Sequence, residues 1–416
     1  MDQRADVLVI GGGVIGVCAA YYLQQEGRRV VLLDKDEICS GSSHGNAGWL
    51  VPSHSVPLAR PGAILNGLRW MLRPESPFYV KPRLSLELIA WLWRFRAAAN
   101  ERTVRRSLPV ACELSKASLE LYEELITKEE LDCYYEQRGL IALYATEQGL
   151  EEGIEEAHLL REHGISSQEL DSTQVTAMEP AVRSDVAGGI YHDGDAHLKP
   201  DDLVHGLADR FQAQGGVIHT GTEVLGFELA GDTIASVKTD KGDYPARQVV
   251  LAAGAWSPDV ARALKLRLPV QPAKGYSITF DEPVDPPSMP VMLAEARIGV
   301  TPMGPVLRFA GTLELSGLNT DIDRRRVDAI RRAWHRYLAT DLSASPETVW
   351  CGMRPLTPDN LPIIGAVDRP SNLIVATGHS MTGVTLGSVT GKLVSQLVTE
   401  QDPIVDPAPF SPMRFR

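Results

Sequence analysis

The feature that most constrains the fold is a run of closely spaced glycines after the first apolar segment. Residues 5–10 read Ala-Asp-Val-Leu-Val-Ile, which predicts a buried parallel strand, and the glycines of a G-x-G-x-x-G pattern follow at Gly11, Gly13 and Gly16. An apolar helix pattern and a second strand that ends at Asp34 complete a βαβ unit. Such a unit binds a dinucleotide, with the pyrophosphate at the helix N-terminus and a ribose hydroxyl at the acid.

Each glycine of this turn has its own role. Gly11 allows the tight turn, Gly13 lets the backbone approach a pyrophosphate, and Gly16 lets helix and strand pack closely. A glycine-rich turn in an ordinary α/β domain is the alternative, but it leaves the acid at the strand end without a role. Because Asp34 is acidic rather than basic, a free ribose 2′-hydroxyl, and hence FAD or NAD, is favoured over NADP.

Length, charge and cysteine usage exclude several classes of protein. The chain has 416 residues, more than one hydrophobic core usually serves, so two domains are expected. A formal net charge of −12 leaves no basic excess for a nucleic-acid partner. The five cysteines are scattered without a C-x-x-C pair, so we expect neither a disulfide framework nor a metal site. No signal-peptide pattern and no run of about eighteen apolar residues is present, so a cytoplasmic location is expected.

Glycine-punctuated strand and helix signals stand at both ends of the chain, with a region of different character between them. The predicted class is therefore α/β, with a discontinuous Rossmann-like domain and an inserted α+β domain that contains a large antiparallel or mixed sheet. We assign the first domain to residues 1–58, 195–268 and 350–416, and the inserted domain to residues 59–194 and 269–349.

One stretch of the inserted domain mixes tryptophans and arginines. Helices are predicted at Ile64–Leu72 and Leu84–Ala99. Such helices can lie on a membrane surface, here the inner face of the plasma membrane, or they can be buried helices of the second domain. The sequence leaves both interpretations open for residues 64–99.

Motifs spread over almost the full length resemble the D-amino-acid oxidase-like flavoproteins. The chain is most similar to the bacterial FAD-dependent D-amino acid dehydrogenases, with glycine oxidase and sarcosine oxidase as more distant relatives. The matching segments are Val9–Gly16, Ser42–Gly48, Leu251–Ser257, Lys274–Ser277, Gly352–Asp359 (Gly-Met-Arg-Pro-Leu-Thr-Pro-Asp) and Gly378–Gly383.

This resemblance implies a bound FAD. His44 and Cys351 stand near positions where some relatives attach the flavin, but both are out of register, so a non-covalent flavin is expected. The cofactor-binding residues that the resemblance implies are Gly11, Gly13, Val14, Ile15, Gly16, Asp34, Lys35, Ser42, Ser43, Asn46, Ala47, Gly48, Val224, Ala253, Gly254, Trp256, Gly378, Met381, Thr382 and Gly383.

The resemblance also implies the residues that bind substrate. Arg354 is predicted to hold a carboxylate, because a guanidinium recognises it through two parallel hydrogen bonds. Arg308 is a second carboxylate candidate, and Tyr276 is predicted to bind substrate or close the pocket. His379 is predicted to act near the flavin. A packed tyrosine and a structural histidine are the alternatives for the last two residues.

The sequence departs from this family at one strand. Amino acid oxidases of this group often carry a tyrosine in a Tyr-x-x-Pro strand that touches the substrate carboxylate. The corresponding segment here is Gly299-Val300-Thr301-Pro302, with glycine in place of tyrosine. The wall of the substrate pocket is therefore left unassigned.

The implied reaction is oxidation of a D-amino acid to a 2-oxo acid and ammonia, by hydride transfer from the α-carbon to flavin N5. A quinone or a dye is the expected electron acceptor. The alternative within enzymes is an amine oxidase or dehydrogenase acting on glycine, sarcosine, D-proline or D-hydroxyproline. A flavin-dependent domain for RNA modification and a non-catalytic dinucleotide sensor are the alternatives outside this class, and the acidic charge speaks against the first.

Overall fold

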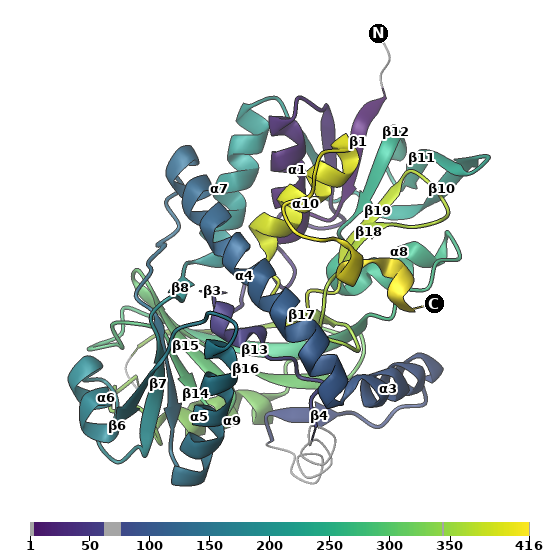
Figure 1. Cartoon of the computed structure of the whole chain (residues 1–416). Coiled ribbons are helices and arrows are strands. Elements are labelled where there is room, and N and C mark those ends of the chain that lie inside the picture. Colours follow the sequence, from purple (N-terminus) through teal and green to yellow (C-terminus); the bar gives the residue numbers. More distant parts are fainter. Residues whose placement is uncertain (1–3, 62–75, 343–344, 416) are drawn as a thin grey trace.

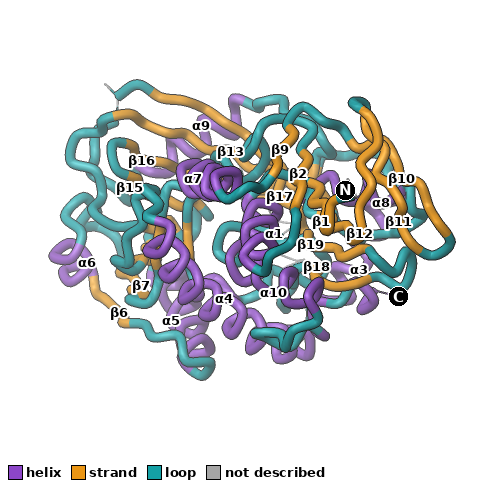
Figure 2. Tube along the Cα trace, turned by 90° about the horizontal axis from the view of Figure 1, so that it is seen from above, coloured by secondary structure: helices purple, strands orange, loops and turns teal. Residues whose placement is uncertain are grey.

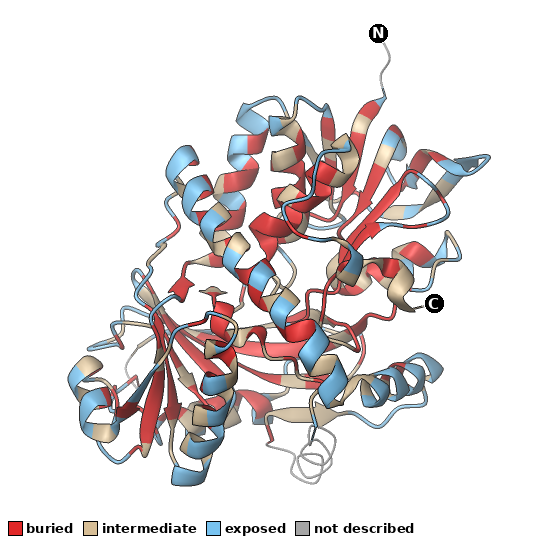
Figure 3. Cartoon of the chain, in the orientation of Figure 1, coloured by how far each residue is buried: buried red, intermediate tan, exposed pale blue. Residues whose placement is uncertain are grey.

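The computed structural model describes residues 4–61, 76–342 and 345–415, and its strands form two large sheets (Figure 1). Figure 2 shows β1, β2, β12 and β19 gathered at one side of the molecule and β7, β15 and β16 at the other. The buried residues follow the strands of both sheets, whereas α3 and the outer face of α4 are largely exposed (Figure 3). Each sheet therefore has its own core, as expected for a chain of this length.

The first sheet has a parallel centre in the order β9-β2-β1-β12-β19, and β18 pairs antiparallel with β19 at one edge. The first half of β12 pairs with the antiparallel hairpin β10-β11. The strands are β1 (Ala5–Ile10), β2 (Val30–Leu33), β9 (Val217–His219), β10 (Val224–Ala230), β11 (Thr233–Thr239), β12 (Gly242–Leu251), β18 (Ile363–Ala366) and β19 (Leu373–Thr377).

Four helices pack together around one face of this sheet: α1 (Val14–Gln25), α4 (Glu101–Glu129), α7 (Pro200–Ala213) and α10 (Gly387–Thr399). Helices α1 and α10 pack very closely, because a Cβ at Gly391 would lie 2.6 Å from the backbone carbon of Cys18. The other face is covered by the hairpin β10-β11 and by η2 (Gly254–Trp256) and α8 (Ser257–Arg262).

The second sheet is mostly antiparallel, in the order β17-β13-β16-β15-β14-β5-β7-β6, with β4 beside β16. Among the described strands of this second sheet, only the pairs β14–β5 and β16–β4 are parallel. The strands are β4 (Phe78–Val80), β5 (Leu140–Tyr144), β6 (Gln168–Asp171), β7 (Gly188–His192), β13 (Gln271–Asp281), β14 (Val291–Leu293), β15 (Ile298–Met303), β16 (Val306–Leu315) and β17 (Glu347–Leu356).

Helices cover one face of the second sheet and only part of the other. Helices α6 (Ser172–Met178) and α9 (Arg324–Trp334) pack on one face, and α5 (Glu147–Arg161) covers β5 and β7 on the other. The two-stranded sheet of β3 (Trp49–Leu50) and β8 (Ala196–His197) joins the halves near η1 (Pro52–Ser55). The chain ends in η3 (Ala408–Phe410) and η4 (Pro412–Phe415).

Helix α3 (Leu86–Ala98) is docked by one side only. Leu88 and Trp91 are buried, and the Trp91 indole N–H donates to the carbonyl of Leu356 at 3.1 Å. The other predicted helix of this stretch, Ile64–Leu72, lies outside the described residues. No helix in the described part of the chain is both long and apolar enough to cross a bilayer.

The fold class predicted from the sequence is confirmed, but two of the expected domain limits do not match the sheets. The boundary at residue 350 falls inside β17, which pairs with β13 in the second sheet along its whole length. Helix α4 was placed in the inserted domain, yet it packs against α10 in the first core. Both differences arise because strand pairing and helix docking depend on distant residues.

Candidate active site

A cavity of about 1880 Å³ lies between the two sheets and is lined by both. One end of its lining comes from the glycine turn after β1 and the C-terminal ends of β2 and β12. The other end comes from the inner face of β13, β16, β15 and β17. Ligands of open parallel sheets bind at such strand ends, so the cavity is the candidate site.

The glycine turn forms a narrow cradle at the start of α1. Gly13 is the N-cap and offers no side chain, while the Ser43 hydroxyl accepts the Val14 N–H at 2.9 Å. Gly11 has φ +115°, and a Cβ there would lie 2.5 Å from the carbonyl oxygen of Ala252. A Cβ at Gly16 would lie 1.8 Å from the carbonyl oxygen of Gly11. Apart from the Ser43 hydroxyl, no side chain caps this helix N-terminus, and the glycines let a phosphate approach its N–H groups, as a dinucleotide requires.

Asp34 is fixed at the end of β2 by backbone donors. Its two carboxylate oxygens accept the N–H groups of Gly12 at 2.6 Å and of Asp36 at 2.8 Å. Burial raises the pKa of Asp34, and these two backbone hydrogen bonds act in the opposite direction. The carboxylate lines the cavity, where its remaining lone pairs can accept ribose hydroxyls.

The cavity continues from the end of β2 to the residues after β12. The Lys35 ammonium lies 4.7 Å from the centre of the Trp256 ring. Trp256, Val224, Ala253 and Gly254 line the cavity there, and an aromatic ring suits an adenine. The residues therefore fit FAD from pyrophosphate to adenine.

The loop 42–48 is held by its own polar side chains. The Ser42 hydroxyl donates to the carbonyl of Met353, and the Asn46 amide donates to the carbonyls of Ser42 at 3.1 Å and Ser43 at 2.8 Å. Gly48 donates its N–H to the Asn46 side-chain oxygen at 2.8 Å, and it does not line the cavity. These three predicted cofactor residues therefore shape the loop, and Ser42 and Asn46 reach the cavity with their other atoms.

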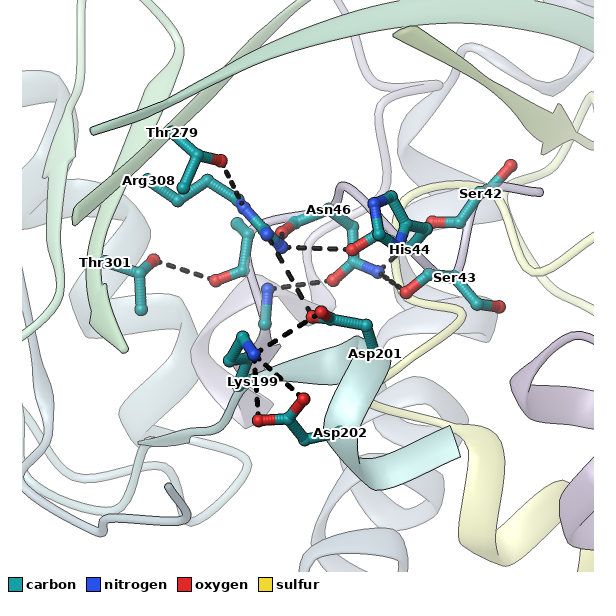
Figure 4. Close-up of polar contacts among 12 residues, drawn as sticks. Ser42, Ser43, His44, Asn46, Lys199, Asp201, Asp202, Thr279, Thr301 and Arg308 are labelled. Atoms are coloured by element: carbon teal, nitrogen blue, oxygen red, sulfur yellow. Dashed lines mark hydrogen bonds and ion pairs between the residues drawn. The ribbon is translucent and has the colours of Figure 1, made fainter. Parts of the chain in front are cut away.

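Arg308 does not face the cavity; it supports this loop from beneath (Figure 4). Its Nη1 donates to the carbonyls of His44 at 3.0 Å and Asn46 at 3.2 Å, and its Nε donates to the Thr279 hydroxyl at 3.0 Å. Asp201 lies 4.0 Å from its Nη2. This geometry does not favour the prediction that Arg308 is a second carboxylate ligand, because its donors already hold the loop 42–48.

Arg354 has the opposite environment, because its guanidinium lines the cavity. Nη1 donates to the carbonyl of Thr312 at 2.8 Å, and a Cβ at Gly275 would lie 1.7 Å from the same nitrogen. No carboxylate in the described ranges is within ion-pair distance of Arg354. Burial lowers the pKa of Arg354 to about 10, so it stays cationic at neutral pH. The buried Thr312 hydroxyl also lacks a hydrogen-bond partner within the described residues.

The Tyr276 hydroxyl points away from Arg354. Along β13, Gly275 contacts Arg354, so Tyr276 faces the opposite side of the sheet. Its hydroxyl donates to the Glu314 carboxylate at 3.0 Å and accepts the Asp323 N–H at 3.5 Å. The structure therefore does not bring the Tyr276 hydroxyl to the substrate, and the packed alternative describes it better.

His379 is engaged by helix α10. Its Nε2 lies 3.0 Å from the Thr390 hydroxyl, and burial lowers the pKa of His379 to about 3. The imidazole is thus neutral at neutral pH. His379 lines the cavity, as expected, and its contact with Thr390 favours the structural alternative, while a role beside the flavin stays a prediction.

The segment 378–383 precedes α10 and forms the cavity wall opposite β17. Gly378 has φ +74° and packs against Thr357, whose methyl group would lie 2.5 Å from a Cβ at this position. Met381, Thr382 and Gly383 line the cavity, as predicted for flavin contacts. The Ser380 N–H donates to the carbonyl of Pro355 at 3.0 Å, which ties this segment to the end of β17.

Two tryptophans that were not among the predicted site residues, Trp49 and Trp350, line the cavity. Trp350 fits between two glycines, because Cβ atoms at Gly45 and Gly352 would lie 2.2 Å and 2.0 Å from its ring. Trp49 lies on Gly299 in the same way, at 2.5 Å. Glycines in strands mark such close approaches, so they were the available signal.

Neither residue considered for a flavin bond is well placed for one. The Cys351 thiol donates to the carbonyl of Thr320 at 3.2 Å and faces the side of β17 opposite Arg354. His44 is exposed, with its ring 6.1 Å from Trp350. A non-covalent flavin stays a prediction, and this geometry favours it.

A glycine cradle, an acid at the end of β2 and a guanidinium without an acidic partner among the described residues all line one cavity, which is the arrangement expected of a flavin-dependent oxidoreductase. The chain matches the family model of DAO, FAD dependent oxidoreductase, over residues 6–397, and it belongs to this family. FAD is therefore its cofactor.

Known relatives span the whole chain. The D-amino acid dehydrogenase of Methylobacterium radiotolerans is 32% identical over 409 residues, which is 95% of this chain and 96% of that protein. The D-amino acid dehydrogenase of Helicobacter pylori is 29% identical over 396 residues, 95% of each chain. The crystal structure of glycine oxidase from Geobacillus kaustophilus has a TM-score of 0.78 and 25% identity, with 98% of both chains covered.

Proposed function

We propose that this FAD-dependent oxidoreductase oxidises D-amino acids to 2-oxo acids and ammonia. The observation that supports this most is Arg354, a half-buried cation that faces the cavity without an acidic partner among the described residues. A charge that is partly removed from water and unpaired is costly, so a site that keeps one is suited to an anion. The near full-length similarity to D-amino acid dehydrogenases supplies the substrate class.

The chain's own residues bind and orient in this proposal. Arg354 holds the α-carboxylate through two parallel N–H donors, which fixes the direction of the α-carbon. The cavity walls exclude water, and the substrate amine must be neutral so that its lone pair assists loss of the α-hydrogen. The bound flavin supplies the redox chemistry by accepting a hydride. The rate then depends on positioning rather than on an acid–base side chain.

An anaerobic absorbance measurement on the purified protein tests the proposal. The purified protein should show the yellow flavin spectrum, and anaerobic addition of D-alanine should bleach it while L-alanine does not. The products should be pyruvate and ammonia in equal amounts. A flavoprotein that no D-amino acid bleaches would refute this function.

A second candidate is a glycine, sarcosine, D-proline or D-hydroxyproline oxidase or dehydrogenase, which the likeness to glycine oxidase favours. Assays of these four amines beside D-alanine, with dioxygen and with a dye as acceptors, separate the two. We propose the dehydrogenase, with a quinone or a dye taking the electrons, so the dye should support turnover and dioxygen should not.

We also propose that α3 and the residues before it contact a membrane surface, at the inner face of the plasma membrane. Leu84, Leu86, Ile89 and Trp93 are exposed apolar side chains on this segment. The exposed Arg94 lies among them, as expected of an interfacial helix with anionic lipids. The docked side of α3 supports the other interpretation, a helix of the second domain, without excluding surface contact.

Co-sedimentation with phosphatidylglycerol vesicles at low salt tests this contact. The parent should bind and Trp93→Glu should bind less, because a carboxylate at this position is repelled by anionic lipid. Equal binding of parent and variant, or no binding of the parent, would refute the membrane proposal.

A further inference from the structure

Trp49 occupies the space that a side chain at position 299 would take. It is the first residue after the loop 42–48 and lies in β3. A Cβ built on Gly299 of β15 would lie 2.5 Å from the indole Cζ2 and 2.6 Å from Cη2. Trp49 also lines the cavity. The glycine that left the pocket wall unassigned in the sequence therefore makes room for an indole from another part of the chain.

Hydrogen bonds fix this indole at its edge and at its backbone. Its Nε1–H donates to the Thr301 hydroxyl at 2.8 Å, and that hydroxyl donates in turn to the carbonyl of Ala47 at 2.8 Å. The Trp49 carbonyl accepts the Thr385 hydroxyl at 2.8 Å. The ring is thus anchored to β15 and to the segment before α10, so it cannot leave the cavity by a simple rotamer change.

His54 packs beside the ring. The His54 imidazole lies 5.1 Å from the indole, centre to centre, and its Nε2 is 3.1 Å from the Met292 sulfur. The His54 Nδ1 is 3.2 Å from the Ser53 hydroxyl, which donates to the buried Asp195 carboxyl. His54 and Met292 line the cavity as well, so these contacts hold the indole as one part of the cavity wall.

Sheet register places this wall close to Arg354. The guanidinium donates to Thr312 of β16, and Gly299 pairs with Ala310 of the same strand. Ala310 also pairs with Ser277 of β13, and Gly275, which contacts Arg354, faces the same side as Ser277. Neighbouring strands are about 4.8 Å apart, so Trp49 and Arg354 lie over the same sheet face, two strands from each other.

We propose that Trp49 is the specificity-determining residue of this enzyme and limits the size of the substrate side chain. The inference rests on the proposed oxidation of D-amino acids and extends it to the substrate class: small side chains are accepted, and bulky aromatic or branched ones meet the indole. Gly299 lies beneath the indole and, because it has no side chain, leaves the space that the ring occupies.

Three variants test the proposal: Trp49→Ala, Trp49→Phe and Thr301→Val. The measurement is kcat/KM for D-alanine and for D-phenylalanine with a dye acceptor, after flavin content is checked by absorbance. Trp49→Ala should shift the ratio at least tenfold toward D-phenylalanine, and Trp49→Phe less. Thr301→Val removes the hydroxyl that anchors the ring, and should shift the ratio in the same direction. Tyr134→Ala, an aromatic deletion outside the cavity, is the matched control.

An unchanged ratio in flavin-loaded Trp49→Ala, or a shift toward D-alanine, would overturn the proposal. If that variant does not retain flavin, Trp49→Phe and Thr301→Val decide by the same ratio. Failure of the proposed function is a separate result, because then the parent itself would oxidise neither amino acid.

Discussion

At the scale of single residues, two arginines on the same sheet face differ in what their donors already hold. Arg308 donates to the loop carbonyls of His44 and Asn46, so its hydrogen bonds are used within the protein. Arg354 has one internal acceptor, the carbonyl of Thr312, and otherwise faces the cavity. The sequence alone cannot tell these two arginines apart, because their hydrogen-bond partners come from distant segments of the chain.

Replacing Arg354 should abolish productive binding of the carboxylate. We expect Arg354→Ala to lower kcat/KM by two or more orders of magnitude, since a bidentate charge-assisted contact is lost. Arg354→Lys should recover only part, because an ammonium lacks the planar fork. Steady-state kinetics on the best substrate measure this, with the exposed Arg324→Ala as control. Unaltered kinetics in Arg354→Ala would remove this residue from the site.

Replacing Arg308 should affect the flavin more than the substrate. Arg308→Met removes the donors that hold the loop 42–48, so we expect weaker retention of FAD while the KM for substrate in FAD-saturated enzyme stays near that of the parent. Flavin-to-protein ratio after gel filtration and fluorescence titration with FAD report this. A variant with full flavin and a much raised KM would show that Arg308 binds substrate after all.

Asp195 is a buried carboxyl whose titration couples to folding. It accepts the Ser53 N–H at 3.2 Å and the Ser53 hydroxyl at 2.5 Å, yet burial raises its pKa from 3.8 to about 7. The folded protein thus holds this proton more tightly than the unfolded chain. The stabilising contribution is complete below about pH 4 and is lost as the pH rises through about 7.

Asp195→Asn should remove this pH dependence. Relative to the parent, we expect the variant to gain about 1–3 kcal/mol of folding stability between pH 4 and pH 8. Chemical denaturation at several pH values measures the difference, with the exposed Asp209→Asn as control. If the gap between Asp195→Asn and parent is the same at all pH values, Asp195 does not titrate in this range.

At the scale of elements, the start of α1 is the part most fully predictable from sequence. The strand β1, the glycine turn and the acid after β2 lie where the local pattern placed them. Helix α1 begins at Val14, directly after the glycine turn, so the turn itself leads into its first residues. Helix α10 begins at Gly387, and Val384 and Thr385 before it line the cavity.

The same element gives a sharp test of backbone packing. Gly16→Ala should cost about 1–3 kcal/mol and release FAD, because the new methyl group would lie 1.8 Å from the Gly11 carbonyl and push α1 away from β1. Gly194→Ala is the control, since nothing lies within 4 Å of its Cβ position. Thermal unfolding and flavin content decide; a fully flavin-loaded Gly16→Ala of parental stability would contradict this packing.

At the scale of the whole molecule, one cavity is lined by both sheets, so a flavin bound in it would contact both cores. A ligand that binds only the folded protein stabilises it, by about 2.7 kcal/mol at a free concentration 100 times Kd. We therefore expect removal of FAD to lower the Tm and re-addition to restore it in a concentration-dependent way. Calorimetry of apo- and holoprotein measures this, and equal Tm values would contradict stabilisation by FAD.

The sequence by itself determined the nucleotide half and the class of the enzyme. Local rules suffice there, because the turn requires glycines and the ribose requires an acid at fixed spacing. Arg354 was predicted from the motif Gly352–Asp359. Another residue of this motif, Asp359, has a structural role, because its carboxylate forms an ion pair with Arg414 at 2.8 Å.

Tertiary structure alone decided which side chains face the cavity. It moved the Tyr276 hydroxyl to the far face of β13, used Arg308 to hold a loop, and placed Trp49 on Gly299. The physical reason is that strand register and packing across the two sheets set these neighbours, and both depend on residues some 250 positions apart, as between Trp49 and Thr301 (separation 252).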